Sequence, residues 1–168
     1  MPTDKLLELE GLTKYFYKPM GLLGRRKQVV QSVDHVSFHI LRHETFGLVG
    51  ESGCGKSTLG RTITRLYEPT EGKILYDGTD ISHLTGPQLL PYRKRIQMIF
   101  QDPYSSLNPR SRAGDIIREP MELLNVGPRE ERGGEVLRLM EAVGLRPDQA
   151  RLFPHQFSGG QRQRIAIA

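Results

Sequence analysis

Nine consecutive residues restrict the fold of this chain more than any other stretch. Residues 50–58 have the sequence GESGCGKST, which fits the phosphate-binding pattern G-x-x-x-x-G-K-[ST]. Glycines let backbone N–H groups approach a phosphate closely, because glycine lacks a Cβ and tolerates positive φ. A helix that begins near Lys56 directs unpaired N–H groups and its positive dipole end at the same anion. The pattern therefore predicts a phosphate site between a strand and a helix.

The sequence around this loop supports the same interpretation. The apolar residues 46–49 are expected to form a strand before it, and Leu59, Ile63 and Leu66 to share one face of the helix after it. A simple glycine turn is the alternative, but it does not explain the Lys-Ser pair. Lys56 is expected to reach the outer phosphates, and the Ser57 hydroxyl to bind Mg²⁺. The predicted phosphate site comprises Gly50, Glu51, Ser52, Gly53, Cys54, Gly55, Lys56, Ser57 and Thr58.

The length, composition and net charge of the chain limit the classes of protein to which it can belong. A length of 168 residues allows one domain with a core, and 37% hydrophobic residues suit a soluble globular chain. No apolar run approaches the roughly 18 residues that a membrane-spanning helix needs. The first residues lack a signal-peptide layout, and a single cysteine fits a reducing cytosol. The net charge of +5 is compatible with nucleic acid, an acidic lipid surface or polyphosphate, although solvated surface side chains explain it best.

The first part of the chain predicts strands. Apolar and polar residues alternate in residues 7–9 and again in residues 36–40. His35 and His39 then lie on the polar face, so alternation explains them better than a metal site. Residues 73–76, followed by Asp77-Gly78, predict a strand that enters a hairpin turn.

A further strand is expected before a loop. Residues 96–100 are apolar and suit a buried parallel strand. Pro103 disfavours helix at the residue before it, which places Gln101 where the strand gives way to a loop.

The composition then changes to a block that predicts helices. Residues 104–127 are polar and interrupted by proline, with one helical patch at Ile116-Ile117. Residues 135–143 form an amphipathic pattern that Gly144 is suited to end. Gly133-Gly134 are poor helix formers, at a cost of about 1 kcal/mol each relative to alanine. The block is interpreted as a helical subdomain inserted into an α/β core.

A last motif lies close to the end of the sequence. Ser158 can cap a helix while Gln161 bonds back to it, which is a capping box. Capping does not explain Gly159 and Gly160, which weaken the first turn. Bare N–H groups at a glycine-flanked helix start make a second anion-binding site.

These motifs resemble those of the ATP-binding subunits of ABC transporters. GESGCGKST looks like their Walker A motif, Gln101 like their Q-loop glutamine, and FSGGQ like their signature motif, with Phe157 in place of the common leucine. The stretches IQMIFQDPYSSLNPR and FPHQFSGGQRQRIAIA, with the early insertion GLLGRR, resemble the oligopeptide/dipeptide importer branch. The resemblance covers essentially the whole chain.

The resemblance implies an α/β fold with a P-loop NTPase core, an N-terminal antiparallel β layer and a helical subdomain. We expect the β layer and P-loop core in residues 1–101, the helical subdomain in residues 102–157 and the start of the signature helix in residues 158–168. In the family, this helix leads to a strand with a Mg²⁺-linked aspartate and the glutamate that polarises water. The sequence contains neither, so we expect one partial domain, incomplete at its C-terminus, with hydrolysis near background. The strand at residues 46–49 would then lack a neighbour.

The resemblance also implies residue roles. Phe16, or alternatively Tyr15, would stack on adenine. Gln101 would contact Mg²⁺ and the attacking water. Residues 158–161 (Ser158, Gly159, Gly160 and Gln161) would contact ATP bound to a second subunit, in a head-to-tail homo- or heterodimer.

The implied function is ATP binding, with hydrolysis in the family, to drive peptide import across the inner membrane. Expected partners are transmembrane permease subunits, contacted from the cytoplasmic face through the Gln101 loop and the helical block, and no nucleic acid. One alternative is a nucleotide-binding fragment without turnover. Another is a soluble ABC protein that acts on nucleic acid or ribosomes, against which the importer-like stretch after Gln101 argues.

Overall fold

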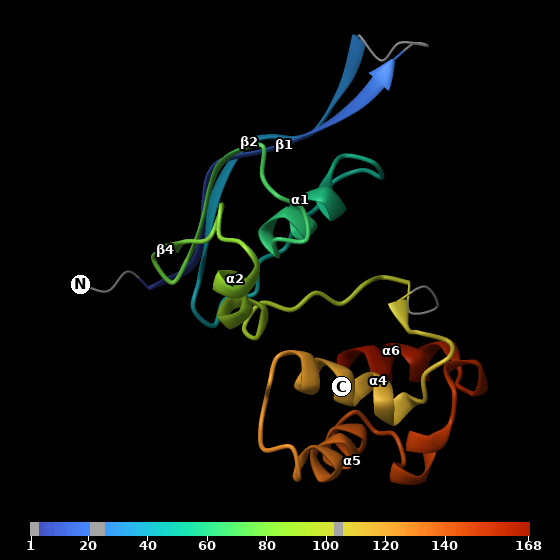
Figure 1. Ribbon diagram of the computed structural model, residues 1–168. Helices are drawn as coiled ribbons and strands as arrows, with labels where there is room; N and C mark the ends of the chain where they lie inside the picture. The colour runs from blue at the N-terminus through green and yellow to red at the C-terminus, as the bar shows by residue number, and fades with distance from the viewer. Residues whose placement is uncertain (1–3, 21–25, 103–105) are drawn as a thin grey trace. The chain divides into compact units, whose positions relative to one another are not determined.

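The chain forms two compact units, residues Met1–Met98 and Ile99–Ala168 (Figure 1). The structure is a computed structural model and describes residues 4–20, 26–102 and 106–168. Each unit has its own cluster of buried apolar side chains, so the two units are described separately.

The first unit is built on a four-stranded antiparallel sheet with the order β2-β1-β3-β4. The long strands β1 (Lys5–Met20) and β2 (Arg26–Leu41) pair along their length, as Figure 1 shows. The strand β3 (Glu71–Tyr76) pairs with the other side of β1, and β4 (Thr79–Asp80) pairs with β3. The predicted antiparallel layer is confirmed. So is the hairpin turn, where Asp77 and Gly78 have φ values of 51° and 76°.

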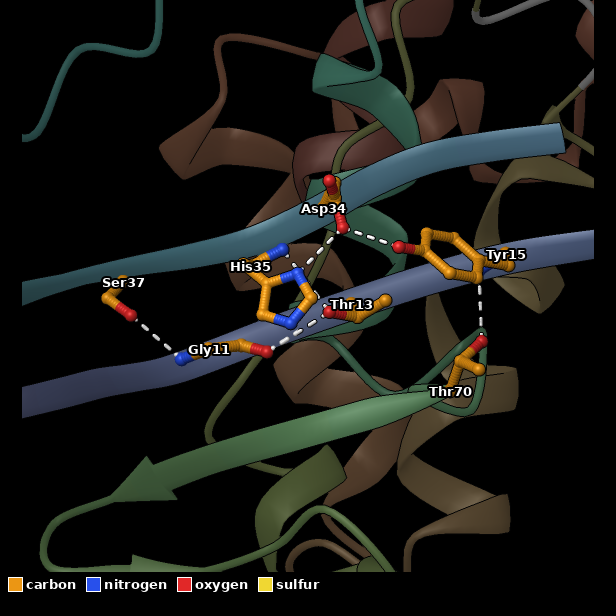
Figure 2. A network of polar contacts seen from close by, with 7 residues as sticks. All are labelled: Gly11, Thr13, Tyr15, Asp34, His35, Ser37 and Thr70. Carbon is orange, nitrogen blue, oxygen red and sulfur yellow. Dashed lines mark hydrogen bonds and ion pairs between the residues drawn. The ribbon is translucent and has the colours of Figure 1, made fainter.

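The pairing of β1 with β2 shifts register near its middle, and side chains supply hydrogen bonds there (Figure 2). The Gly11 N–H donates to Ser37 Oγ at 2.8 Å, and the His35 N–H donates to Thr13 Oγ1 at 3.2 Å. Unpaired strand N–H groups are costly, so these contacts make the irregularity tolerable.

One face of the sheet packs on the helix α1 (Lys56–Ile63), and α2 (Gly86–Arg93) follows β4. Leu59 of α1 is buried and Ile63 is partly buried, as predicted. The prediction for Leu66 is wrong, because the helix has ended and Leu66 is 53% exposed. Arg65 adopts the left-handed conformation with φ 57°, which a continuing helix does not allow. The buried apolar cluster comprises Leu7, Leu9, Leu12, Val33, Leu59, Ile74 and Ile81.

Two predicted strands are wrong. Residues 46–49 and 96–100 form no regular secondary structure, and no strand of the described residues pairs with them. Val49 is 93% exposed, although Phe46 stacks on Phe38 with ring centroids 4.7 Å apart. A strand requires a hydrogen-bonded neighbour, and apolar composition does not provide one.

The second unit is helical. It contains α4 (Ala113–Leu123), α5 (Arg132–Ala142), two short 3₁₀ helices, η1 (Pro147–Arg151) and η2 (Pro154–Gln156), and α6 (Gly159–Ile167). The predicted helical patch at Ile116-Ile117 lies within α4. The buried cluster comprises Leu107, Ala113, Ile117, Val136, Met140, Leu145, Phe157 and Ile165.

The helix α5 begins three residues earlier than predicted and includes Gly133 and Gly134. The buried Arg132 explains this start, because its guanidinium donates to the carbonyl oxygens of Val126 and Gly127 at 3.1 Å each. These hydrogen bonds of Arg132, the first residue of α5, offset the weak helix propensity of Gly133 and Gly134. The predicted end is confirmed, since Gly144 has φ 73°. In the described ranges, no helix has the length and apolar character needed to cross a membrane.

Candidate functional site

The phosphate loop lies against strand β2. Gly55 is the N-cap of α1 with φ 98°, and a Cβ at this position would clash with the carbonyl oxygen of Ser32. Only glycine satisfies both the backbone conformation and the close approach. The loop is therefore anchored to the sheet where the helix begins.

The ammonium of Lys56 lies over the middle of the loop. Its Nζ donates to the carbonyl oxygens of Gly50 and Glu51, each at 2.6 Å, and lies 3.5 Å from Cys54 Sγ. These carbonyl oxygens are neutral acceptors, and a phosphate oxygen is a stronger one for an ammonium. The contacts thus hold the charge where an anion bound in the loop would meet it.

The first turn of α1 is suited to receive that anion. The helix has no side-chain cap. Its first backbone hydrogen bond runs from the Leu59 N–H to the carbonyl oxygen of Gly55, at 2.8 Å. The N–H groups before Leu59 therefore have no helical acceptor. Ser57 is exposed next to Lys56.

A Mg²⁺ ion fits this arrangement. Mg²⁺ in phosphate sites takes few protein ligands together with phosphate oxygens and water, and the exposed Ser57 hydroxyl is one such ligand. No cluster of three or more His, Cys, Asp or Glu side chains suited to a metal is present within the described ranges. An ion here would therefore depend on the nucleotide for most of its ligands.

The aromatic segment of β1 lies in the same unit as the loop. Tyr15 is paired with Gln31, next to the Ser32 carbonyl that Gly55 faces. The Phe16 ring packs edge-on against Tyr67 with centroids 5.4 Å apart, and Lys14 Nζ lies 5.1 Å from its centre. Phe16 itself is paired with Val30, two residues before Ser32 in β2.

Both the backbone N–H and the side-chain hydroxyl of Tyr15 form hydrogen bonds. Its N–H donates to Thr70 Oγ1 at 2.9 Å, and its hydroxyl donates to Asp34 Oδ1 at 2.5 Å. Figure 2 shows His35 Nδ1 at the same carboxylate, at 2.7 Å. The hydrogen bond to Asp34 raises the pKa of Tyr15 to about 12, and the same bond, with that of His35, lowers the pKa of Asp34. Of the two residues predicted as candidates to stack on adenine, Tyr15 is therefore the one whose hydroxyl already has a partner.

The signature-like segment begins α6 in the second unit. The Ser158 N–H donates to Gln161 Oε1 at 3.0 Å and the Gln161 N–H donates to Ser158 Oγ at 3.3 Å, which confirms the predicted capping box. A Cβ added at Gly160 would meet no atom of the described chain within 4 Å. The start of this helix is therefore open to a ligand.

The predicted site residues divide between the two units. Phe16 and the loop residues 50–58 lie in the first, whereas Gln101 and residues 158–161 lie in the second. Gln101 is exposed in a bend near the start of its unit.

Sequence reasoning missed Ser32, Tyr67 and Thr70. None belongs to a motif, and each reaches the loop or the aromatic segment only because distant parts of the chain pack together. The carbonyl group of Ser32, which leaves no room for a Cβ at Gly55, lies 23 residues earlier in the chain. A local sequence pattern therefore does not reveal this contact.

A lysine centred over a glycine loop at the start of a helix defines the class of P-loop nucleotide-binding proteins. A family profile described as "ABC transporter" matches residues 33–168, and the chain belongs to this family. The fold agrees with this assignment. It resembles the ATP-binding cassette MJ0796, solved as a dimer in a post-hydrolysis state bound to ADP and Pi. That match has a TM-score of 0.78 at 30% identity and covers 96% of this chain and 67% of the cassette.

Curated relatives are similar over nearly all of this chain. The oligopeptide transport ATP-binding protein AppF of Bacillus subtilis is 52% identical over 166 residues, which are 98% of this chain and 50% of AppF. The dipeptide transport ATP-binding protein DppF of Haemophilus influenzae is 47% identical and covers 97% of this chain and 50% of DppF. The chain thus spans about half the length of the curated relatives it matches.

Proposed function

We propose that this chain binds ATP with Mg²⁺ as the nucleotide-binding part of an ABC importer for peptides. The observation that carries the proposal is the position of Lys56 Nζ, at 2.6 Å from two loop carbonyls and beside the uncapped start of α1. The printed names of AppF and DppF support peptides as the cargo.

Each part of the site has a role in this proposal. The N–H groups of residues 50–58 and Lys56 hold the phosphates. Phe16 stacks on the base, a role that an aromatic ring on the strand pair behind Gly55 can fill. The Ser57 hydroxyl ligates Mg²⁺. Gln101 is proposed as a second contact of the ion.

A lysine substitution tests nucleotide binding. In the proposed complex the Lys56 ammonium donates two charge-assisted hydrogen bonds to phosphate oxygens, each worth about 1.5 kcal/mol. Lys56→Ala removes both, so the Kd for ATP–Mg²⁺ should rise about 100-fold. Fluorescence titration with a labelled ATP analogue measures this, with circular dichroism as a check of folding. Lys73→Ala is the matched control, because Lys73 is an exposed lysine of the same unit that pairs with Glu10 at 3.6 Å. Equal affinities for both folded variants would refute the proposal.

The start of α6 is proposed to contact nucleotide bound to a second ATP-binding subunit. Its open Gly160 supports this role. Gly160→Leu should weaken ATP-dependent dimerisation about 10-fold in sedimentation experiments, since the added side chain fills the ligand side of the helix start. Gly133→Leu is the control, because Gly133 also has open space in the first turn of a helix. Identical dimerisation of the two variants would contradict the role.

Membrane permease subunits are the proposed partners, with association at the cytoplasmic face of the inner membrane. Tagged protein should sediment with membranes that carry the permease and be recovered free of RNA. Recovery with RNA would instead favour an ABC protein that acts on nucleic acid. Phosphate release, measured for the chain alone and after mixing with a full-length relative, distinguishes ATP turnover from binding alone.

A further inference from the structure

A buried arginine follows the phosphate-loop helix and is not explained by nucleotide binding. Arg65 is only 7% exposed. Its Nε donates to the carbonyl oxygen of Ile81 and its Nη2 to that of Leu84, both at 3.0 Å. The guanidinium therefore ties the end of α1 to the segment that leads from β4 into α2.

The third nitrogen of this guanidinium has no acceptor among the described residues. Nη1 of Arg65 is buried, and no atom of the described residues accepts a hydrogen bond from it. Buried donors are nearly always paired in native proteins, either with a protein group or with an ordered water molecule, because an unmet donor is costly. Something other than the described protein atoms should accept this bond.

A small cavity adjoins the same side chain. It has a volume of about 10 Å³, and its lining includes Thr64, Arg65, Ile81, Leu89, Tyr92 and Arg93. About 10–15 Å³ is the space that one water molecule requires. The cavity therefore matches a single water molecule in size.

The chemistry of the lining favours an acceptor of hydrogen bonds. Burial lowers the pKa of Arg65, Glu68 opposes this shift, and the neighbouring charge of Arg93 lowers the pKa further. With two guanidinium groups at the cavity, an electron-rich atom is favoured inside it.

Thr64 supplies a second polar partner. Its hydroxyl proton is directed at the carbonyl oxygens of Gly60 and Arg61, at 3.0 Å and 3.3 Å, so the lone pairs of Oγ1 can accept a hydrogen bond from the occupant. A buried water molecule typically makes two to four hydrogen bonds, and Arg65 with Thr64 meets the lower number.

We propose that this cavity binds one ordered water molecule, which accepts a hydrogen bond from Arg65 Nη1 and donates one to Thr64 Oγ1. The water completes the polar cluster that fixes the end of α1, the helix that begins at the phosphate loop. The proposal does not depend on nucleotide binding.

A crystal structure of the chain, grown in sodium bromide and measured at the bromine absorption edge, tests the occupant. The expected result is a single density peak within hydrogen-bond distance of Arg65 Nη1 and Thr64 Oγ1, with no anomalous signal. An anomalous peak would identify a halide and overturn the proposal. A cavity without density would overturn it as well.

A pair of threonine variants tests the second partner. Thr64→Val and Thr62→Val each remove a hydroxyl that donates to a carbonyl of α1, at 3.0 Å and 2.8 Å, but only Thr64 lines the cavity. The density peak should be lost or displaced in Thr64→Val and retained in Thr62→Val. A peak that is unchanged in Thr64→Val would refute the assigned geometry.

Discussion

The antiparallel sheet and the apolar residues 46–49 belong to the same unit. They differ in the burial of their side chains and in whether their backbone has a paired neighbouring strand. Leu12 and Ile74 of the sheet are fully buried, whereas Val49 is 93% exposed. Antiparallel neighbours arise from hairpins between strands close in sequence, while a parallel strand needs a partner brought by a crossover. Similar apolar composition therefore gives a core in one place and an exposed, irregular segment in the other.

The largest expected difference between these regions is in stability. Ile74→Ala should lower the free energy of unfolding by about 2–5 kcal/mol, because it removes a fully buried side chain and leaves a cavity. Val49→Ala should change it by no more than about 0.5 kcal/mol. Denaturant unfolding followed by circular dichroism measures both. If Val49→Ala proved as costly as Ile74→Ala, residues 46–49 would be packed in solution and the comparison would fail.

A glycine pair sharpens the account of the sheet. Gly72 has φ 84°, and a Cβ there would clash with the Gly11 carbonyl of the neighbouring strand. Gly72→Ala should therefore cost about 3 kcal/mol, from strain and displaced backbone. Gly78→Ala is the control, because Gly78 has φ 76° but no described atom within 4 Å of the added Cβ, so about 1 kcal/mol is expected. Similar melting temperatures for the two variants would rule out the contact as the cause.

In the second unit, the capping contact between Ser158 and Gln161 joins residues only three positions apart. It can be compared with the long-range contact between Gly72 and Gly11. Ser158→Ala removes the side-chain oxygen that accepts from the Gln161 N–H, and should cost about 1 kcal/mol. Ser158→Thr retains the hydroxyl and should cost less. Thermal unfolding of the two variants provides the measurement, and a larger loss in Ser158→Thr would contradict the capping role.

The smallest effect is expected on the exposed side of β1, where it is seen in a titration. Asp34→Asn should return the pKa of Tyr15 from about 12 toward its ordinary value of 10.0. His35→Ala should leave the pKa of Tyr15 near 12, because the bond between Tyr15 and Asp34 remains. Ultraviolet difference titration of tyrosine follows both variants.

The sign of the linked stability follows from these directions. The pKa of Tyr15 is higher in the folded chain, so the contribution of its bond is complete below pH 10.0 and is lost as pH rises through about 12. The pKa of Asp34 is lowered, so its contribution is present above its unfolded value and is lost as pH falls through the folded value. Asp34 is exposed and Tyr15 is partly exposed, so water screens their interaction.

Several elements could be predicted because their causes lie within a few residues of one another. The phosphate loop follows from its glycines and the Lys-Ser pair, and the cap of α6 from Ser158 and Gln161 three residues apart. The end of α5 follows from Gly144, whose positive φ ends a helix at little cost. Alternation within residues 36–40 is likewise a local signal.

Other features depend on segments that are far apart in the chain. Sequence patterns did not show that Ser32 would meet Gly55, that Arg132 would start α5 early, or that Arg65 would be buried. They also predicted strands at residues 46–49 and 96–100, where the structure provides no neighbour among its described strands. The physical reason is that propensity and periodicity act between near residues, whereas burial and strand pairing exist only once distant segments have packed.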